Sequence, residues 1–130
     1  MPSNAPACGS PQDWLSRAES DLALASIKPI RRIRLEDLCY HAQQSVEKAL
    51  KAVLLSLGVV FPRTHNIKIL VERLPDTLFC EPTLDRAAVL TDYSVTARYP
   101  GEIEPVTRDE LKEALHIAAK VLEWEKTVIG

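Results

Sequence analysis

The stretch CYHAQQSVEKALKAVL, residues 39–54, decides the fold because its apolar residues recur at helical spacing. The repeat continues on both sides and predicts a helix from about Leu35 to Leu57, with Gly58 as its C-terminal cap. The apolar positions expected to face the core are Leu38, Ala42, Val46, Ala49, Val53 and Leu57. The stretch therefore predicts a central helical element.

A polar stripe follows another side of the same helix. Its members, separated by three, four and three residues and so on one face, are His41, Gln44, Lys48 and Lys51. One interpretation is a solvated surface crossed by pairs such as Glu47–Lys51. The other is one wall of a polar groove, in which the lysines would meet phosphate and His41 could exchange a proton near neutral pH. The spacing alone leaves both interpretations open.

Two further helices are expected before and after this element. The first begins near Pro11 with Ser10 as its cap and ends by Pro29, since proline suits the first helical turn and disrupts an interior. The last follows Thr107 and Glu110, three residues apart, which form a capping box.

Between them, a short helix is predicted in IKILVERL, residues 67–74, capped by Thr64 or Asn66 and closed by Pro75. A fourth long helix is predicted from Thr83 to about Ala97. No segment shows the alternation of a strand. The sequence therefore predicts an all-α fold, an up-and-down helical bundle of four long helices plus one short helix.

Length and composition favour one globular domain. In 130 residues we expect a flexible leader at 1–10 and a single helical domain at 11–128. The formal net charge of −2 gives no overall attraction to nucleic acid or to an anionic membrane. The three cysteines form no CxxC pair, which argues against a disulfide framework or a zinc site, so no metal or cofactor is expected. No apolar run approaches the roughly 20 residues of a membrane span, and no signal peptide is recognised, so we expect a cytoplasmic protein without a membrane partner.

Two other motifs are candidates for ligand contact. In FPRTHN, residues 61–66, Thr64 and His65 fall at a predicted helix N-terminus, where free N–H groups favour an anion. In DYSVTARYPG, residues 92–101, Arg98 and Tyr99 combine a guanidinium group with an aromatic ring, which suits phosphate and base together. A capped helix and a helix-dipole contact are the structural alternatives.

The connection KPIRRIR, residues 28–34, carries four positive charges. It is either a nucleic-acid patch or a solvated connection. Trp14 and Trp124 lie on apolar faces and are expected in the core.

These motifs together resemble the HEPN family (higher eukaryotes and prokaryotes nucleotide-binding domain). The resemblance rests on HAQQ..EKALKA, on P.TH.I and on RYP, in the family's order, and it spans about residues 13–123. The positions that match its motifs are His41, Gln44, Glu47, Lys48, Lys51, Thr64, His65, Tyr93, Arg98, Tyr99 and Pro100.

The resemblance implies a homodimer of helical bundles. It also implies a minimal nucleotidyltransferase as partner, in a two-component or toxin–antitoxin-like pair, because many prokaryotic members have one. Other members are ribonucleases, and some have been proposed to bind nucleotides. Ribonuclease members resemble one another in an arginine, a polar residue and a histidine close together on a late helix. Here Arg98 has no such histidine, and the only similar spacing joins Arg34 to His41, with Leu35 at the polar position.

Three hypotheses follow. The first is a non-catalytic module that binds a nucleotide or another phosphate-containing ligand through the stripe, the Thr64–His65 turn and the Arg98–Tyr99 pair. The alternative is a metal-independent ribonuclease that uses Arg34 and His41, or His41, His65 and Arg98. The second alternative is a structural interaction dimer without ligand. A single groove requires the His41, Lys48 and Arg98 side chains to lie within about 12 Å of one another.

Overall fold

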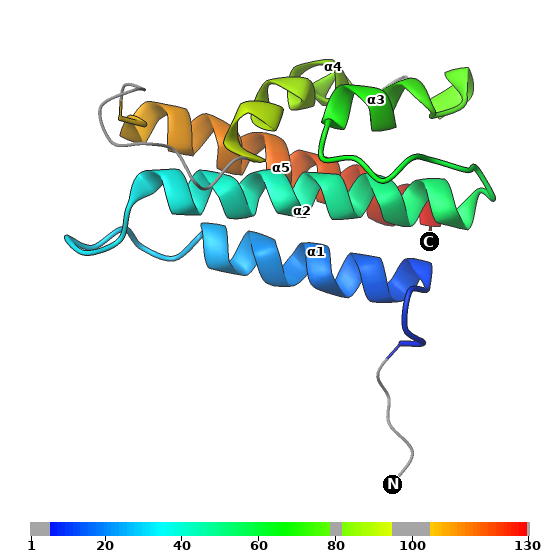
Figure 1. The fold of residues 1–130 in the computed structure, drawn as a ribbon, viewed down its shortest axis with the longest axis horizontal. Coiled ribbons are helices and arrows are strands. Elements are labelled where there is room, and N and C mark those ends of the chain that lie inside the picture. The colour runs from blue at the N-terminus through cyan, green and yellow to red at the C-terminus, as the bar shows by residue number, and fades with distance from the viewer. Residues whose placement is uncertain (1–5, 79–81, 95–104, 130) are drawn as a thin grey trace, which may run out of the picture.

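The helix predicted from residues 39–54 lies at the centre of the molecule. In the computed structural model, which describes residues 6–78, 82–94 and 105–129, this helix is α2 (Leu35–Ser56). It packs mainly against α1 (Pro11–Ala25), α3 (Ile67–Glu72), the 3₁₀ helix η2 (Ala88–Ser94) and α5 (Arg108–Ile129) (Figure 1). The described residues contain helices and no strand, so the predicted all-α bundle is confirmed.

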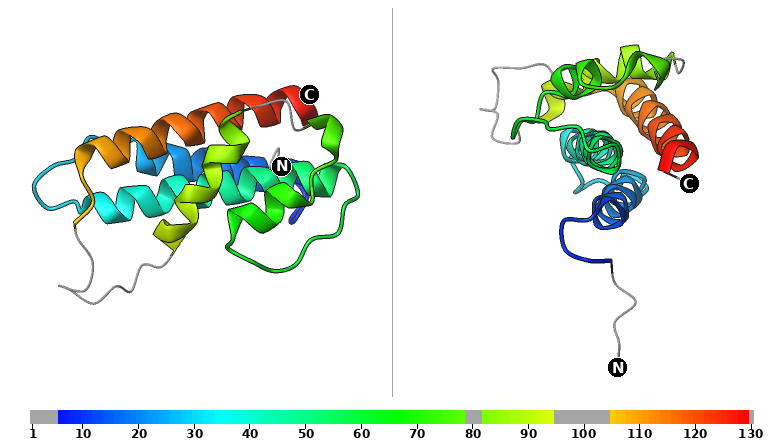
Figure 2. Two further views of the ribbon diagram at one scale, coloured as in Figure 1. Left: turned by 90° about the horizontal axis from the view of Figure 1, so that it is seen from above. Right: turned by 90° about the vertical axis from the view of Figure 1, so that its right-hand side faces the viewer.

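The chain runs back and forth along the bundle. α1 and α2 run in opposite directions, whereas α5 lies beside α2 and runs in the same direction as α2 (Figure 1). The elements between them cross α2 on the side away from α1 (Figure 2), in the order α3, η1 (Asp76–Leu78), α4 (Thr83–Ala87) and η2. α2 is thereby covered on more than one side, so polar residues on its different faces become buried.

The helix ends match the caps that the sequence predicts. Ser10 Oγ accepts from the Asp13 N–H at 3.1 Å, and Asn66 rather than Thr64 caps α3 by accepting from the Lys68 N–H at 3.0 Å. Gly58 has a φ of 71°, the left-handed conformation that glycine adopts without strain after a helix.

The capping box before α5 is also present. Thr107 Oγ1 accepts from the Glu110 N–H at 3.1 Å, and Glu110 Oε1 accepts from the Thr107 N–H at 3.2 Å. These two bonds satisfy backbone donors that the first turn of α5 leaves free.

The fourth predicted helix differs from the structure. Instead of one long α-helix from Thr83, α4 ends at Ala87 and the chain continues as the 3₁₀ helix η2 to Ser94, while residues 95–97 lie outside the described residues. The β-branched Val89 and Thr91 weaken α-helix formation here. A three-residue turn also places Ala87 and Leu90 on the same buried side.

The predicted core is largely correct. All apolar positions predicted for α2 are buried except Leu57, which is 42% exposed because it follows the last turn of the helix. Trp124 belongs to the core, but Trp14 is only half-buried, and the Lys51 ammonium lies 5.5 Å from its ring centre. Among the described residues, no helix has the length and hydropathy needed to cross a membrane.

Candidate functional site

The polar stripe of α2 is not a solvated surface. Gln44 and Lys51 are each only 8% exposed, and the adjoining Gln43, Ser45 and Glu47 are buried as well. Buried polar groups are costly unless they are hydrogen-bonded, so each of these side chains needs a partner. The structure supplies these partners around two acidic residues, Asp21 and Glu47.

The first group, the Asp21 centre, joins α1 to α2. Asp21 lies on α1 and is 6% exposed. Its Oδ1 is 3.0 Å from Nδ1 of His41, and its Oδ2 is 2.6 Å from Nζ of Lys48. One buried carboxylate therefore holds both a histidine and a lysine of the stripe.

The second group, the Glu47 centre, joins α2 to the loop before α3. Glu47 is 2% exposed. Its Oε2 accepts from Lys51 Nζ at 2.9 Å, and its Oε1 lies 3.1 Å from Gln43 Nε2 and 2.8 Å from His65 Nδ1. The predicted Glu47–Lys51 pair is confirmed, although it is buried rather than exposed.

Small residues let α1 approach α2 closely enough to form the Asp21 centre. Ala18 and Ala25 flank Asp21 on the inner side of α1 and are fully buried. The Ser45 hydroxyl of α2 donates to the Ala18 carbonyl at 2.8 Å. Asp21 therefore occupies a position of α1 that would otherwise hold an apolar core residue.

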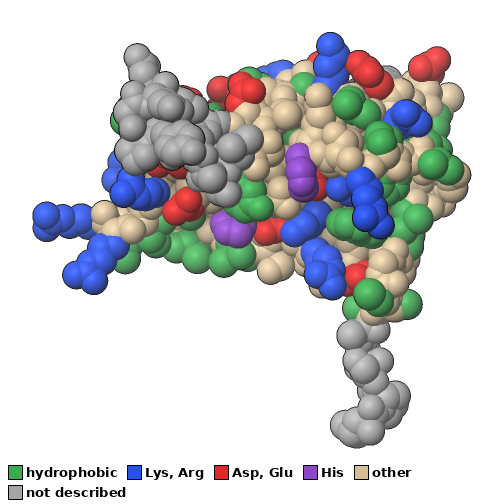
Figure 3. Space-filling model, viewed as in Figure 1, with side chains coloured by type: hydrophobic (Ala, Val, Ile, Leu, Met, Phe, Trp, Pro, Cys, Tyr) green, Lys and Arg blue, Asp and Glu red, His purple; other side chains and the backbone are tan. Residues whose placement is uncertain are grey.

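Each of the two histidines is held through one of its ring nitrogens, Nδ1. The side chains of His41 and His65 are 33% and 70% exposed, and each directs Nδ1 at a buried carboxylate. Among the described residues, Nε2 of neither ring makes a hydrogen bond. Histidine side chains emerge between basic and acidic side chains on the face shown in Figure 3. A carboxylate on Nδ1 fixes the ring and leaves Nε2 as the contact for a ligand.

Other predicted residues play structural parts. Gln44 Nε2 donates to Gln43 Oε1 at 2.7 Å, and Thr64 Oγ1 accepts from the Asn66 N–H at 3.0 Å. Arg34 precedes α2 as its N-cap residue with an exposed side chain that makes no capping bond. Among the described residues, no hydrogen bond or ion pair joins Arg34 to His41.

Tyr93, another motif residue, lies on η2. Its hydroxyl donates to Glu110 Oε2 at 3.2 Å. Burial, followed by the charges of Cys39 and Glu110, raises the pKa of Tyr93, so this hydroxyl stays a hydrogen-bond donor. Arg98, Tyr99 and Pro100 lie outside the described residues, and the 12 Å criterion for Arg98 stays a prediction.

Sequence reasoning missed two members of the centres. Asp21 could have been found as the one acid on the inner side of α1, three residues after Ala18 and four before Ala25. Gln43, which is fully buried, donates both to Glu47 and to the His65 carbonyl at 3.2 Å. Its role depends on the path of the 57–66 loop, for which the sequence carries no signal.

A third buried acid, Glu125 on α5, stands apart from both centres. It is fully buried, and neither of its carboxylate oxygens accepts a hydrogen bond in the described part of the chain. Burial first, and then the charge of Glu19, raise the pKa of Glu125 to about 7, against a smaller opposing effect of Lys126.

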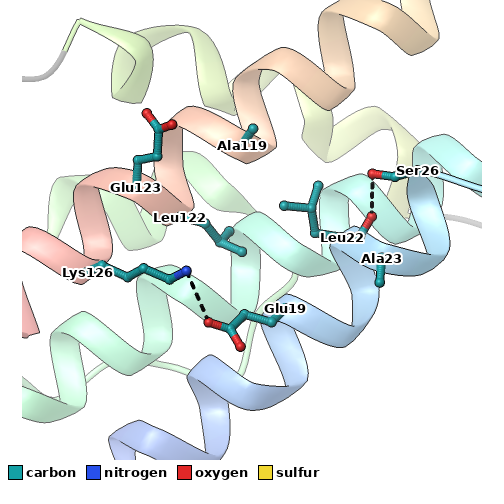
Figure 4. Close-up of a pocket in the computed structure, with 8 residues that line it drawn as sticks. All are labelled: Glu19, Leu22, Ala23, Ser26, Ala119, Leu122, Glu123 and Lys126. Carbon is teal, nitrogen blue, oxygen red and sulfur yellow. Dashed lines mark hydrogen bonds and ion pairs between the residues drawn. The ribbon is translucent and has the colours of Figure 1, made fainter.

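A shallow groove of about 400 Å³ lies between α1 and α5 (Figure 4). It is bridged by Lys126 Nζ and Glu19 Oε1, 3.3 Å apart. The residues that line it are Glu19, Leu22, Ala23, Ser26, Ala119, Leu122, Glu123 and Lys126. None of the predicted site residues is among them, so this groove is distinct from the two carboxylate centres.

The chain is similar to several known proteins. The sequence model of the HEPN domain matches residues 11–128. A protein of Methanocaldococcus jannaschii named "Putative toxin MJ1304" is 32% identical, in an alignment that covers 85% of this chain and 82% of that protein.

Two crystal structures are similar over nearly the whole chain. TT1696 from Thermus thermophilus is 31% identical, with a TM-score of 0.73 over 90% of this chain and 96% of that one. ST0689, an archaeal HEPN homologue, is 28% identical, with a TM-score of 0.67 over 93% of this chain and 98% of that one. With the helical bundle and the motifs of α2 in place, the chain belongs to the HEPN domain family.

Proposed function

We propose that the chain is a non-catalytic HEPN module that binds a nucleotide or another phosphate-containing ligand at the two carboxylate centres. The observation that carries the proposal is that buried Asp21 and Glu47 fix His41 and His65 through Nδ1, while both rings remain partly exposed. When the imidazole rings carry both protons, the two oriented Nε2–H groups donate to phosphate oxygens. Their orientation exists before binding, so little ordering entropy is lost when a ligand arrives.

Lys48 and Lys51 support the same ligand in a different way. Each ammonium group is held by a carboxylate, so it contributes charge to the site without being a free phosphate contact. Since two carboxylates balance two lysines, we expect modest affinity and a dependence on the histidines. In this proposal Arg98 and Tyr99 complete the ligand contacts, together with the Thr64 hydroxyl, which accepts from the Asn66 N–H and still has a proton to donate.

Titration calorimetry with ATP, AMP and inorganic phosphate tests this function. We expect binding heat with the wild-type chain and at least a roughly tenfold loss of affinity in His41→Asn/His65→Asn, the equivalent of about 1.4 kcal/mol. The matched control is His116→Asn, because His116 is the third histidine of the chain and is exposed on α5. Absence of heat at millimolar nucleotide would contradict ligand binding.

We further propose that the chain is a cytoplasmic homodimer that acts with a minimal nucleotidyltransferase, as one half of a toxin–antitoxin-like pair. Support comes from family membership and from the relative named as a toxin. Sedimentation velocity tests the dimer, and co-purification with a nucleotidyltransferase encoded beside it tests the partner. A monomer at micromolar concentration would contradict the dimer.

One observation favours a second function, the metal-independent ribonuclease. The Asp21–His41 and Glu47–His65 pairs have the carboxylate–histidine arrangement used for general acid–base catalysis. The test is cleavage of RNA in the presence of a chelator, with His41→Ala and His65→Ala against His116→Ala. Cleavage that survives in the double variant would reject these residues as its catalysts. If neither binding nor cleavage is found, the structural dimer is the function that is left.

A further inference from the structure

The connection between α1 and α2 carries a surface charge of one sign. The exposed cations Lys28, Arg31, Arg32 and Arg34 are four of the 16 lysines and arginines of the chain, and residues 22–35 contain no acidic residue. None of these four forms an ion pair among the described residues. Although the whole chain has a net charge of −2, the positive charges of this segment make it a local site of attraction for anionic groups.

Apolar side chains lie exposed among these cations. Ile33 packs against the core, whereas Ile27 and Ile30 are 46% and 61% exposed. The segment is held by turns, since the Ile33 N–H donates to the Ile30 carbonyl at 2.9 Å. Basic side chains project from the end of the bundle where this connection lies (Figure 3). The two isoleucines are thus presented to solvent by an ordered segment.

We infer that this connection docks a partner protein whose surface has acidic residues around an apolar recess. Arginine is enriched in protein interfaces, and a few residues packed into desolvated pockets near the centre supply most of the binding energy. Ile27 and Ile30 would fill the recess, while Arg31 and Arg32 would pair with the acidic rim. The positive charge of the connection would also increase the association rate with an acidic protein.

Other anionic surfaces fit these residues less well. Single-stranded nucleic acid is commonly held by aromatic stacking, and residues 22–35 include no aromatic side chain. Interfacial membrane anchors are typically amphipathic helices, and residues 26–34 form turns and irregular backbone instead. An acidic protein surface with an apolar recess gives both the arginines and the isoleucines a partner without requiring a helix or an aromatic side chain.

Photo-crosslinking through residue 30 tests the inference. The full chain with Ile30→p-benzoylphenylalanine is expressed in the cells of origin and irradiated, and the contacted peptide is identified by mass spectrometry. The contacted partner is then purified, and its affinity is measured for the wild type and for Arg31→Glu/Arg32→Glu. The matched control is Lys68→Glu/Lys112→Glu, which changes the net charge equally at exposed lysines on α3 and α5.

We expect an acidic contacted surface and about a thirtyfold loss of affinity in the arginine variant, against less than about twofold in the control. Replacing two contacted acids of the partner by lysine should restore binding to the arginine variant. Ile27→Ser/Ile30→Ser should weaken binding about tenfold without changing its dependence on salt. Adducts with RNA or lipid alone, no adduct, or affinity indifferent to the loop variants would overturn the inference.

The inference rests on the proposed function only in assuming a protein partner. An acidic partner that is not a nucleotidyltransferase would support docking at this connection and refute the partner named above. Nucleotide calorimetry with Arg31→Glu/Arg32→Glu distinguishes partner docking from ligand binding, because we expect the nucleotide affinity of that variant to be unchanged.

Discussion

Lys48 reaches from α2 to α1 and places its Nζ 2.6 Å from Oδ2 of Asp21, a carboxylate that is only 6% exposed. The other oxygen of Asp21 meets His41, seven residues earlier on α2. His41 and Lys48 project from one face of α2 about two turns apart, so a single acid of α1 links these two positions of its neighbour.

Asp21→Asn should lower the free energy of unfolding by about 2 kcal/mol, because the partly buried Lys48 ammonium loses its counter-charge. Urea unfolding followed by circular dichroism measures the change. Adding Lys48→Met should cost less than the sum of the two single changes, since the pair is coupled. Stability of Asp21→Asn within experimental error of the wild type would contradict the role of Asp21.

Glu47→Gln should remove about 3 kcal/mol of stability, since the buried Glu47 meets three donors and the amide can satisfy fewer of them. It should also loosen the loop that His65 fixes, so trypsin should cut after Arg63 more quickly. The control is Glu113→Gln, whose pair with Arg86 is about half-exposed and should change stability by less than about 0.5 kcal/mol. Equal losses of stability in Glu47→Gln and Glu113→Gln would contradict the stabilising role of Glu47.

Glu125 should make stability depend on pH. Its folded pKa is raised to about 7, so the stabilising contribution of the protonated form is fully present below the ordinary value of 4.5 and is lost as pH rises through 7. Glu125→Leu should therefore stabilise the protein more at pH 8 than at pH 4.5, by on the order of 2 kcal/mol. The exposed neighbour substitution Glu123→Gln should show no such difference. Thermal unfolding of both variants between these pH values makes the measurement, and parallel profiles for the wild type and Glu125→Leu would refute it.

Thr107→Ala should cost about 1 kcal/mol, because the capping box before α5 loses the hydroxyl that accepts from the Glu110 N–H. Thr107→Ser keeps this acceptor and should be close to neutral. Chemical denaturation distinguishes the two, and a Ser variant as unstable as the Ala variant would show that the methyl group rather than the cap matters.

Local signals in the sequence predict much of this fold. The periodicity of residues 35–57, Ser10, Gly58 and the Thr107–Glu110 box each act within a few residues, where spacing and backbone chemistry suffice. The 3₁₀ conformation of η2 is harder to predict, because the weak local preference for an α-helix at Val89 and Thr91 acts together with contacts distant in sequence. Thr91 Oγ1, for example, accepts from the Ile67 N–H at 3.1 Å.

The stripe residues of the candidate site could be predicted from the sequence, whereas their partner Asp21 on α1 could not. The stripe of α2 follows from spacing, and Glu47–Lys51 follows from an i, i+4 contact. Asp21 meets His41 and Lys48 across 20 and 27 residues of sequence, and no local rule reports such a contact. The burial of the stripe against Asp21 and Glu47 arises only when the helices pack together, so the spacing of residues on α2 does not reveal it.

The enclosure of α2 by α1, α3, η2 and α5 has a consequence for motion. Residues 42–54, all buried except the half-buried Lys48, have backbone amides that no local opening of a single outer helix can release. In hydrogen–deuterium exchange these amides should form the slowest group and exchange only through global unfolding. The segment that carries most of the polar chemistry of the protein is then also its most rigid one.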